Sequence, residues 1–204
     1  MTNSKTEIAN LAFSFIAAKE IGNLDSEASA EAEACRRHYD NALRRVLRAY
    51  PWSFANQSVT LGLVHDFDDD EDAEWSYSYR YPADCLRLLR IHSGQRTDSR
   101  DTRIAYKIGR DDDGLLIYTD EEDAIVEYTY LEENAARFPD DFIEALAYRL
   151  ASLIVPRLTG GDPWKLQDRM KKEYLEALQN AQATGANEEQ ADEEPDSEFQ
   201  RARG

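Results

Sequence analysis

Residues that commonly carry catalysis are few in this chain of 204 residues. Its three histidines, His38, His65 and His92, have neither HxxxH nor HExxH spacing. None of them stands beside a serine or cysteine in a known nucleophile pattern, and the sequence holds no glycine-rich phosphate loop. We therefore predict a protein that is not an enzyme, with no catalytic residues, no metal ligands and no cofactor.

Two acidic segments have the composition of cation-binding loops. In residues 109–114, Asp111 and Asp113 occupy alternate positions before a glycine. A calcium loop in this register would have glycine at its first ligand position and Asp120 in place of the bidentate glutamate, so a hairpin turn is the better interpretation. Residues 65–74 are interpreted as a solvated loop between strands, although this acidic run could also bind a divalent ion.

A hydrolase acting on cell-wall glycans is the one enzyme class that stays open as an alternative. Its chemistry needs two carboxyl groups that face each other across a cleft. A chain with 41 acidic residues always offers such a pair, so composition alone does not indicate one. The alternating tyrosines Tyr77, Tyr79 and Tyr81 could stack against sugar rings.

Basic residues gather on a helix predicted over residues 28–50. Five arginines lie mostly off its apolar stripe: Arg36, Arg37, Arg44, Arg45 and Arg48. Asp40 is placed to pair with Arg36 and Arg44 at a spacing of four residues. The arginines form either a solvated face or a contact with an acidic neighbour, and their density is unusual in a chain of net charge −17. Arg44, Arg45 and Arg48 are the candidates for a subunit or partner interface.

The element that must organise the rest is a helix predicted over residues 138–158. Its sequence, FPDDFIEALAYRLASLIVPRL, is apolar over most of its circumference, so it should be covered on several sides. It is too short and too charged to span a membrane. Pro139 and the two acids after it suit a helix start, Gly160 suits its end, and Pro156 should kink the last turn.

Other elements follow from the periodicity of the apolar residues. We predict helices over residues 6–19, capped by Thr6 or Ser4, and from Asp162 to about residue 183. Between residues 56 and 131 the period falls to two, which predicts about six short strands in an antiparallel sheet or small sandwich.

The predicted fold is therefore α+β. Residues 1–55 and 136–185 should form a four-helix bundle from N- and C-terminal helices, and residues 56–135 an inserted antiparallel β-domain. Residues 186–204 should form an acidic C-terminal arm with the composition of a disordered segment. Near its end Phe199, Arg201 and Arg203 interrupt the acidity, which suits a docking peptide, although a merely solubilising tail stays open.

Charge and cysteine content narrow the class of protein further. A net charge of −17 argues against a conventional nucleic-acid binder, because neutralising phosphates needs clustered Lys and Arg. Cys35 and Cys85 lie far apart without ligand-type spacing, so we expect buried, reduced thiols. The first residues lack the features of a secretory signal, and we expect synthesis in the cytoplasm.

Four segments resemble one known family. They are EIANLAFSFI at residues 7–16, LRAYPWSFA at 47–55, WSYSYRYPADCLRLLRI at 75–91 and FPDDFIEALAYRLASLIVPRLTG at 138–160. Together they resemble the tail tubular protein A family of tailed bacteriophages, the head-to-tail adaptors or connectors. The resemblance spans residues 7–180, and its most specific parts are the PWSFA corner and the YPADCLR segment. The acidic run at 66–74 is longer than expected for this family.

This resemblance implies a structural virion protein without an active site. Such adaptors form a homo-oligomeric ring, typically of twelve copies, between the capsid portal and the tail nozzle or tube. The helical part faces the portal, the β-domain faces the tail, and DNA passes through the lumen during ejection without sequence-specific binding. It also favours contact of the terminal arm with the portal or a neighbouring subunit, and we expect the arginine face to serve subunit or portal contacts. A head-completion protein of a long-tailed phage, which occupies the equivalent ring, is the alternative of the same kind.

Overall fold

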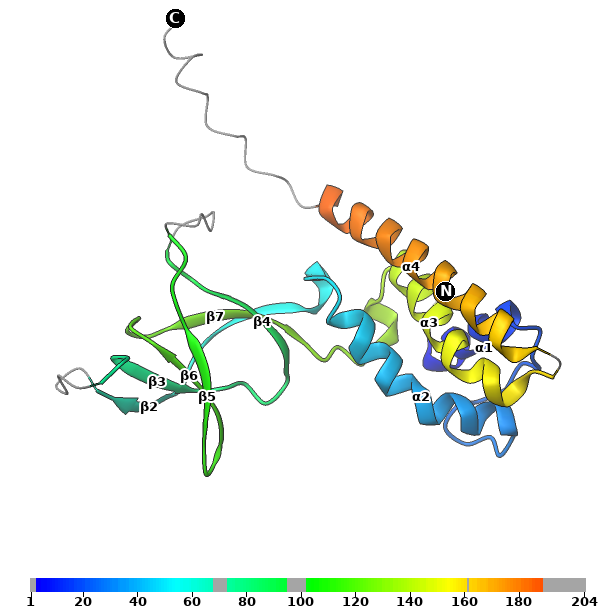
Figure 1. Ribbon diagram of the computed structural model, residues 1–204, viewed down its shortest axis with the longest axis horizontal. Coiled ribbons are helices and arrows are strands. Elements are labelled where there is room, and N and C mark those ends of the chain that lie inside the picture. Colours follow the sequence, from blue (N-terminus) through cyan, green and yellow to red (C-terminus); the bar gives the residue numbers. More distant parts are fainter. Residues whose placement is uncertain (1–2, 68–72, 95–101, 161, 189–204) are drawn as a thin grey trace, which may run out of the picture.

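The computed structural model describes residues 3–67, 73–94, 102–160 and 162–188. These residues form an α+β fold with four α-helices and two antiparallel sheets. The helices lie at one end of an elongated molecule and the sheets at the other (Figure 1). Chain order alternates accordingly: two helices, then the strands, then two helices.

Helix α3, Asp140–Leu158, lies at the centre of the helical part. Ten of its side chains are buried, and they point in all directions around the helix: Phe142, Ile143, Ala145, Leu146, Ala147, Leu150, Ala151, Ser152, Ile154 and Val155. The other three helices all pack against α3: α1 (Lys5–Phe15), α2 (Ala30–Leu47) and α4 (Pro163–Glu188). The expectation of a central helix covered on several sides is confirmed.

Helix α1 begins at its predicted cap and ends earlier than predicted. Ser4 and Glu7 form a reciprocal capping box, in which each side chain accepts a hydrogen bond from the other residue's backbone N–H. The helix stops at Phe15 instead of residue 19, because Ala17 takes a left-handed conformation with φ of 54°. The chain then folds back, and the Asn10 side chain holds the backbone of Ile21 through two hydrogen bonds of 2.9 Å.

Helix α2 also ends before its predicted boundary, at Leu47 instead of residue 50. The indole Nε1 of the buried Trp52 donates to the Val46 carbonyl at 3.0 Å, which occupies an acceptor at the helix end. The predicted pairing of Asp40 with Arg36 and Arg44 is absent from the ion pairs of the described residues. Arg36 instead donates to the carbonyls of Leu24 and Glu27, because the link before α2 lies within its reach.

Seven strands form the two sheets, one more than the sequence predicts. One sheet has the order β1-β7-β4 and the other β2-β3-β6-β5. Their bounds are β1 Asn56–Thr60, β2 Leu63–Asp66, β3 Tyr77–Arg80, β4 Cys85–Ile91, β5 Lys107–Asp111, β6 Gly114–Thr119 and β7 Ile125–Tyr130. The extra strand arises because the run from Val59 to Leu63 splits at Leu61 and Gly62 and passes from one sheet to the other.

Buried residues of both sheets and of the links beside them form one core, and these are Leu61, Tyr79, Ile91, Ile117, Ala124, Val126 and Tyr128. The register of β4 against β7 shifts twice, between Cys85 and Arg87 and between Leu88 and Arg90, as at β-bulges. The turn in residues 109–114 is tighter than predicted. Gly109 lies within β5, and only Asp112 and Asp113 separate the paired residues Asp111 and Gly114.

A cluster of aromatic rings joins the two ends of the molecule. Trp52, Phe54, Phe138 and Phe142 pack with ring centroids 4.9 to 6.1 Å apart. These rings come from the corner after α2 and from the start of α3, where the chain leaves and re-enters the helical part. The corner that follows Pro51 is therefore packed against the start of α3.

Helix α4 extends to Glu188, beyond the predicted limit of residue 183. The first three residues of the predicted arm, 186–188, therefore belong to this helix. Gly185, on its last turns, lies against the Tyr50 ring, with 3.5 Å between an added Cβ and Cε1. The end of α4 thus stays close to the end of α2. Phe199, Arg201 and Arg203 lie outside the described residues.

Candidate interaction groove

The three arginines proposed from the sequence lie on exposed positions at the end of α2. The opposite face of this helix is buried, with Ala42, Leu43 and Val46 in the core. The structure brings Arg45 and Arg48 together at one groove, whereas Arg44 does not line it. Only two of the three arginines predicted from the sequence therefore share this groove.

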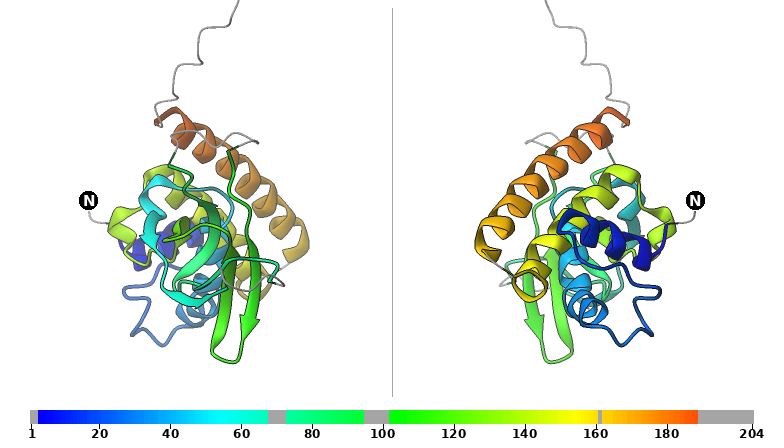
Figure 2. Two further views of the ribbon diagram at one scale, coloured as in Figure 1. Left: turned by 90° about the vertical axis from the view of Figure 1, so that its left-hand side faces the viewer. Right: turned by 90° about the vertical axis from the view of Figure 1, so that its right-hand side faces the viewer.

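The groove has a volume of about 480 Å³ and lies where α2, β4 and α4 meet. Its described lining residues are Arg45, Arg48, Ala49, Arg87, Tyr174, Leu175, Leu178 and Gln182, and we call it the arginine groove. Figure 2 shows α4 running along one side of the helical part, beside the helices that it covers. Because the lining comes from three distant segments, only the folded chain forms this surface.

Arg87 is the functional candidate that sequence reasoning missed. It stands on β4, and its guanidinium Nη1 donates to the backbone carbonyl of Arg48 at 3.3 Å. This contact brings a third guanidinium to the groove. The only sequence signal was a basic residue on the polar face of a strand, and such residues are common on any solvated sheet.

No acid offsets these three charges in the part of the chain that the structure describes. None of the groove's described lining residues is Asp or Glu, although the chain has 41 acids. Arg45, Arg48 and Arg87 have no carboxylate within ion-pair distance among the described residues, whereas Arg80, Arg90 and Arg137 are each paired at 2.7 to 2.8 Å. The groove is therefore a local positive site on a strongly acidic protein.

Apolar surface lies beside these charges. Leu175 is 56% exposed, and Leu178 is half-buried on the same helix. Tyr174 is buried at the wall of the groove, where burial raises its pKa and the nearby charges of Arg149 and Arg45 partly offset that rise. Guanidinium groups bind carboxylates bidentately and also pack against apolar and aromatic surface. This arrangement suits an acidic peptide segment with some apolar character.

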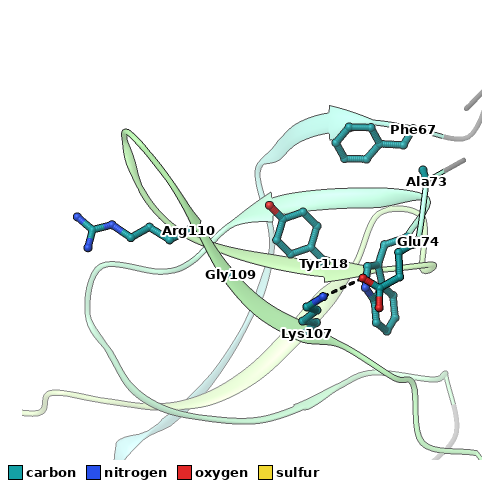
Figure 3. A pocket seen from close by; sticks show the side chains of 8 residues that line it. Phe67, Ala73, Glu74, Lys107, Gly109, Arg110 and Tyr118 are labelled. Atoms are coloured by element: carbon teal, nitrogen blue, oxygen red, sulfur yellow. Dashed lines mark hydrogen bonds and ion pairs between the residues drawn. The ribbon is translucent and has the colours of Figure 1, made fainter.

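A second hollow of about 460 Å³ lies on the four-stranded sheet (Figure 3). Phe67, Trp75 and Tyr118 line it together with Lys107, whose Nζ pairs with Glu74 at 2.8 Å. Glu74 is the only carboxyl among its described lining residues. The hollow therefore lacks, within the described residues, the opposed pair of carboxyls that glycoside hydrolysis needs.

The remaining candidates for chemistry are separated from one another. His92 Nε2 lies 3.1 Å from the Ser58 hydroxyl on the open side of the three-stranded sheet, a contact that the sequence did not indicate. His38 is on α2, where burial and then the charges of Arg157 and Arg37 lower its pKa. Among the described residues, no cluster of three His, Cys, Asp or Glu side chains could hold a metal ion.

Both cysteines are free thiols. Cys35 is buried within α2, and burial raises its pKa to about 12. Cys85 is half-buried, and its Sγ donates to the Tyr81 hydroxyl at 3.1 Å. The expectation of reduced, buried thiols is confirmed for Cys35 and only in part for Cys85.

No helix in the described ranges is long and apolar enough to cross a membrane. Comparison of the chain with protein-family models, and with the sequences of curated proteins, finds no match to either.

Proposed function

We propose that this protein is a structural virion component, a ring-forming head-to-tail adaptor that joins a capsid portal to a tail nozzle or tube. The observation that supports this proposal best is the arginine groove, a cluster of three arginines with no Asp or Glu among its described lining residues, on a protein of net charge −17. A surface of that kind favours contact with acidic protein surfaces, including those of other copies of the chain. The segments that resemble the adaptor family support the same proposal.

In this proposal the four helices form a bundle that faces the portal, and the strands form a domain that faces the tail. The ring contains about twelve copies, as in the family that the sequence resembles. Its acidic lumen repels the phosphates of the passing DNA and keeps the duplex from binding. The terminal residues Phe199, Arg201 and Arg203 supply a second contact with the portal or a neighbouring subunit.

The test combines electron microscopy with a charge variant. Purified protein is mixed with the portal protein and imaged, with and without Arg44→Ser, Arg45→Ser and Arg48→Ser in one chain. These side chains are exposed, so we expect an almost unchanged melting temperature for the monomer and a clear loss of rings.

The matched control removes three charges from exposed positions of α4 outside the arginine groove, as Lys165→Ser, Arg169→Ser and Lys172→Ser. We call it the α4 control variant, and it should assemble normally. Normal assembly of the chain with Arg44→Ser, Arg45→Ser and Arg48→Ser, at both low and moderate salt, would show that these arginines form only a solvated face. Absence of rings with the wild-type chain and portal would overturn the adaptor proposal itself.

A further inference from the structure

Three guanidinium groups at the arginine groove have no acidic partner among the described residues, and the chain itself contains an acidic segment that could supply one. We infer that the arginine groove is the docking site of the protein's own acidic C-terminal segment, residues 189–204, folded back along α4. The inference goes beyond the adaptor proposal and does not rest on it, because it concerns a single chain. Its basis is the charge, the position and the length of the segment.

Charge complementarity is the first argument. Residues 189–204 contain six acids, Glu189, Asp192, Glu193, Glu194, Asp196 and Glu198, and five of them fall within seven positions. The described groove lining contains three arginines and no acid. Hydrogen bonds between guanidinium and carboxylate groups are about twice as strong as neutral ones.

The position of the helix end is the second argument. Helix α4 ends at Glu188, and its residues Tyr174 to Gln182 form one wall of the arginine groove. At a rise of 1.5 Å per residue, the groove therefore begins about 9 Å before the helix end and extends to about 21 Å before it. The segment starts next to the surface that it would occupy.

Residues 189–204 are numerous enough to fold back along the whole length of the arginine groove. An extended chain covers about 3.3 Å per residue, so about seven residues after Glu188 span the whole groove wall. Residues 189–195 include four of the six acids, and nine further residues remain beyond them. A short flexible tether gives an effective concentration in the millimolar range, which favours binding within one chain over binding between chains.

Docking of this kind would cover the groove in the free subunit. Arg45, Arg48 and Arg87 would be neutralised by the segment until a partner with a more favourable acidic surface displaces it. The segment would thereby keep free copies, each of net charge −17, from associating through the arginine groove.

The test uses the full chain with the segment's charge reduced. In the arm-neutral variant, Asp192→Asn, Glu193→Gln, Glu194→Gln and Asp196→Asn remove four carboxylates and keep the length. The probe is a fluorescein-labelled synthetic peptide of residues 189–204, followed by fluorescence anisotropy at low salt. If the wild-type segment already occupies the groove, the peptide should bind the arm-neutral variant at least tenfold more tightly than the wild-type chain.

Addition of Arg45→Ser, Arg48→Ser and Arg87→Ser to the arm-neutral variant should weaken peptide binding at least tenfold. The α4 control substitutions in the same background should change it less than twofold. Circular dichroism melts confirm that each variant is folded. Equal binding to wild-type and arm-neutral chains, or no loss with the three groove substitutions, overturns the inference.

Two further measurements separate other occupants of the groove. Labelled duplex DNA that binds the arm-neutral variant more tightly than the peptide does would identify the groove as a phosphate site and overturn the inference. Sedimentation velocity that shows a wild-type dimer, absent from the arm-neutral variant, would place the segment on a second copy and overturn docking within one chain. No portal is present in these assays, so their outcome is independent of the adaptor proposal.

Discussion

Glu132 offers the sharpest test of how the sheets are attached to the helices. It follows β7 and is only 5% exposed. Its carboxylate accepts hydrogen bonds from the Asn134 backbone N–H at 2.8 Å, from the Tyr130 hydroxyl at 3.0 Å and from Arg137 Nη1 at 2.8 Å. The Tyr130 hydroxyl also lies 3.3 Å from the Phe54 carbonyl, beside the aromatic cluster. Replacement of this one carboxylate should therefore loosen the junction.

The perturbation is Glu132→Gln, which keeps the size of the side chain and removes its charge. The Arg137 side chain is 63% exposed, so solvent screens its ion pair, and this pair contributes at most about 1 kcal/mol. Hydrogen bonds to a charged acceptor contribute about 1.5–3 kcal/mol each, and the Gln oxygen retains part of two of them. We expect the free energy of unfolding to fall by about 1–3 kcal/mol at pH 7.

The pH dependence gives an independent check. Burial alone would raise the pKa of Glu132. Hydrogen bonds from Asn134, Arg137 and Tyr130 lower the pKa by more than burial raises it, so the net shift is downward from 4.5. A carboxyl whose pKa is lower in the folded state stabilises the fold above its unfolded pKa and loses that contribution as the pH falls through its folded value. The difference between wild type and Glu132→Gln should therefore be largest near neutral pH and shrink below pH 4.5.

The assay is urea unfolding followed by circular dichroism at pH 7 and at pH 3.5. Glu133→Gln is the matched control, because Glu133 is the exposed neighbour of Glu132 and should change the free energy by less than about 0.5 kcal/mol. A loss below about 0.5 kcal/mol for Glu132→Gln at pH 7 would refute the structural role. So would a loss of the same size at both pH values.

Two further substitutions test the packing of the central helix and of the four-stranded sheet. Leu150 is fully buried on α3, so Leu150→Ala should lower the free energy of unfolding by about 2–5 kcal/mol in urea melts, and a loss under about 1 kcal/mol would contradict a central position for α3. A Cβ on Gly109 would lie 2.5 Å from Cε2 of the Tyr118 ring, so Gly109→Ala should destabilise the chain by about 1–3 kcal/mol. Tyr118→Ala in the same chain should relieve most of the Gly109→Ala cost, and additive losses would show that the ring is not the obstacle.

The helical part could be predicted well because its signals are local. The apolar residues of α3 cover most of its circumference, so its central position can be predicted before any partner is known. Ser4 and Glu7 have the spacing of a capping box, which marks the start of α1. Helix ends could be predicted less well, because they depend on the segments that follow. The turn at Ala17 ends α1, and the hydrogen bond from Trp52 to Val46 lies at the end of α2.

The division of the strands between two sheets could not be predicted from the sequence. Val59, Leu61 and Leu63 keep one alternation, so the sequence indicates a single strand. The structure divides it because Val59 pairs with β7 in one sheet and Leu63 with β3 in the other. Alternation reports which face of a strand is covered, but it does not report which neighbour each backbone segment has.

Which arginines of α2 line the arginine groove depends on the side of this helix on which the groove lies. Successive residues are about 100° apart around a helix, so Arg44 and Arg45 both lie within about 60° of Arg48, on opposite sides of it. The buried stripe fixes the rotation of α2 and turns all three outward, which the sequence already indicates. Only the position of α4 decides that Arg45 joins Arg48 at the groove and Arg44 does not. Arg44 should therefore affect contacts on its own flank of α2, whereas substitution of Arg45 and Arg48 acts on the surface that α4 and β4 complete.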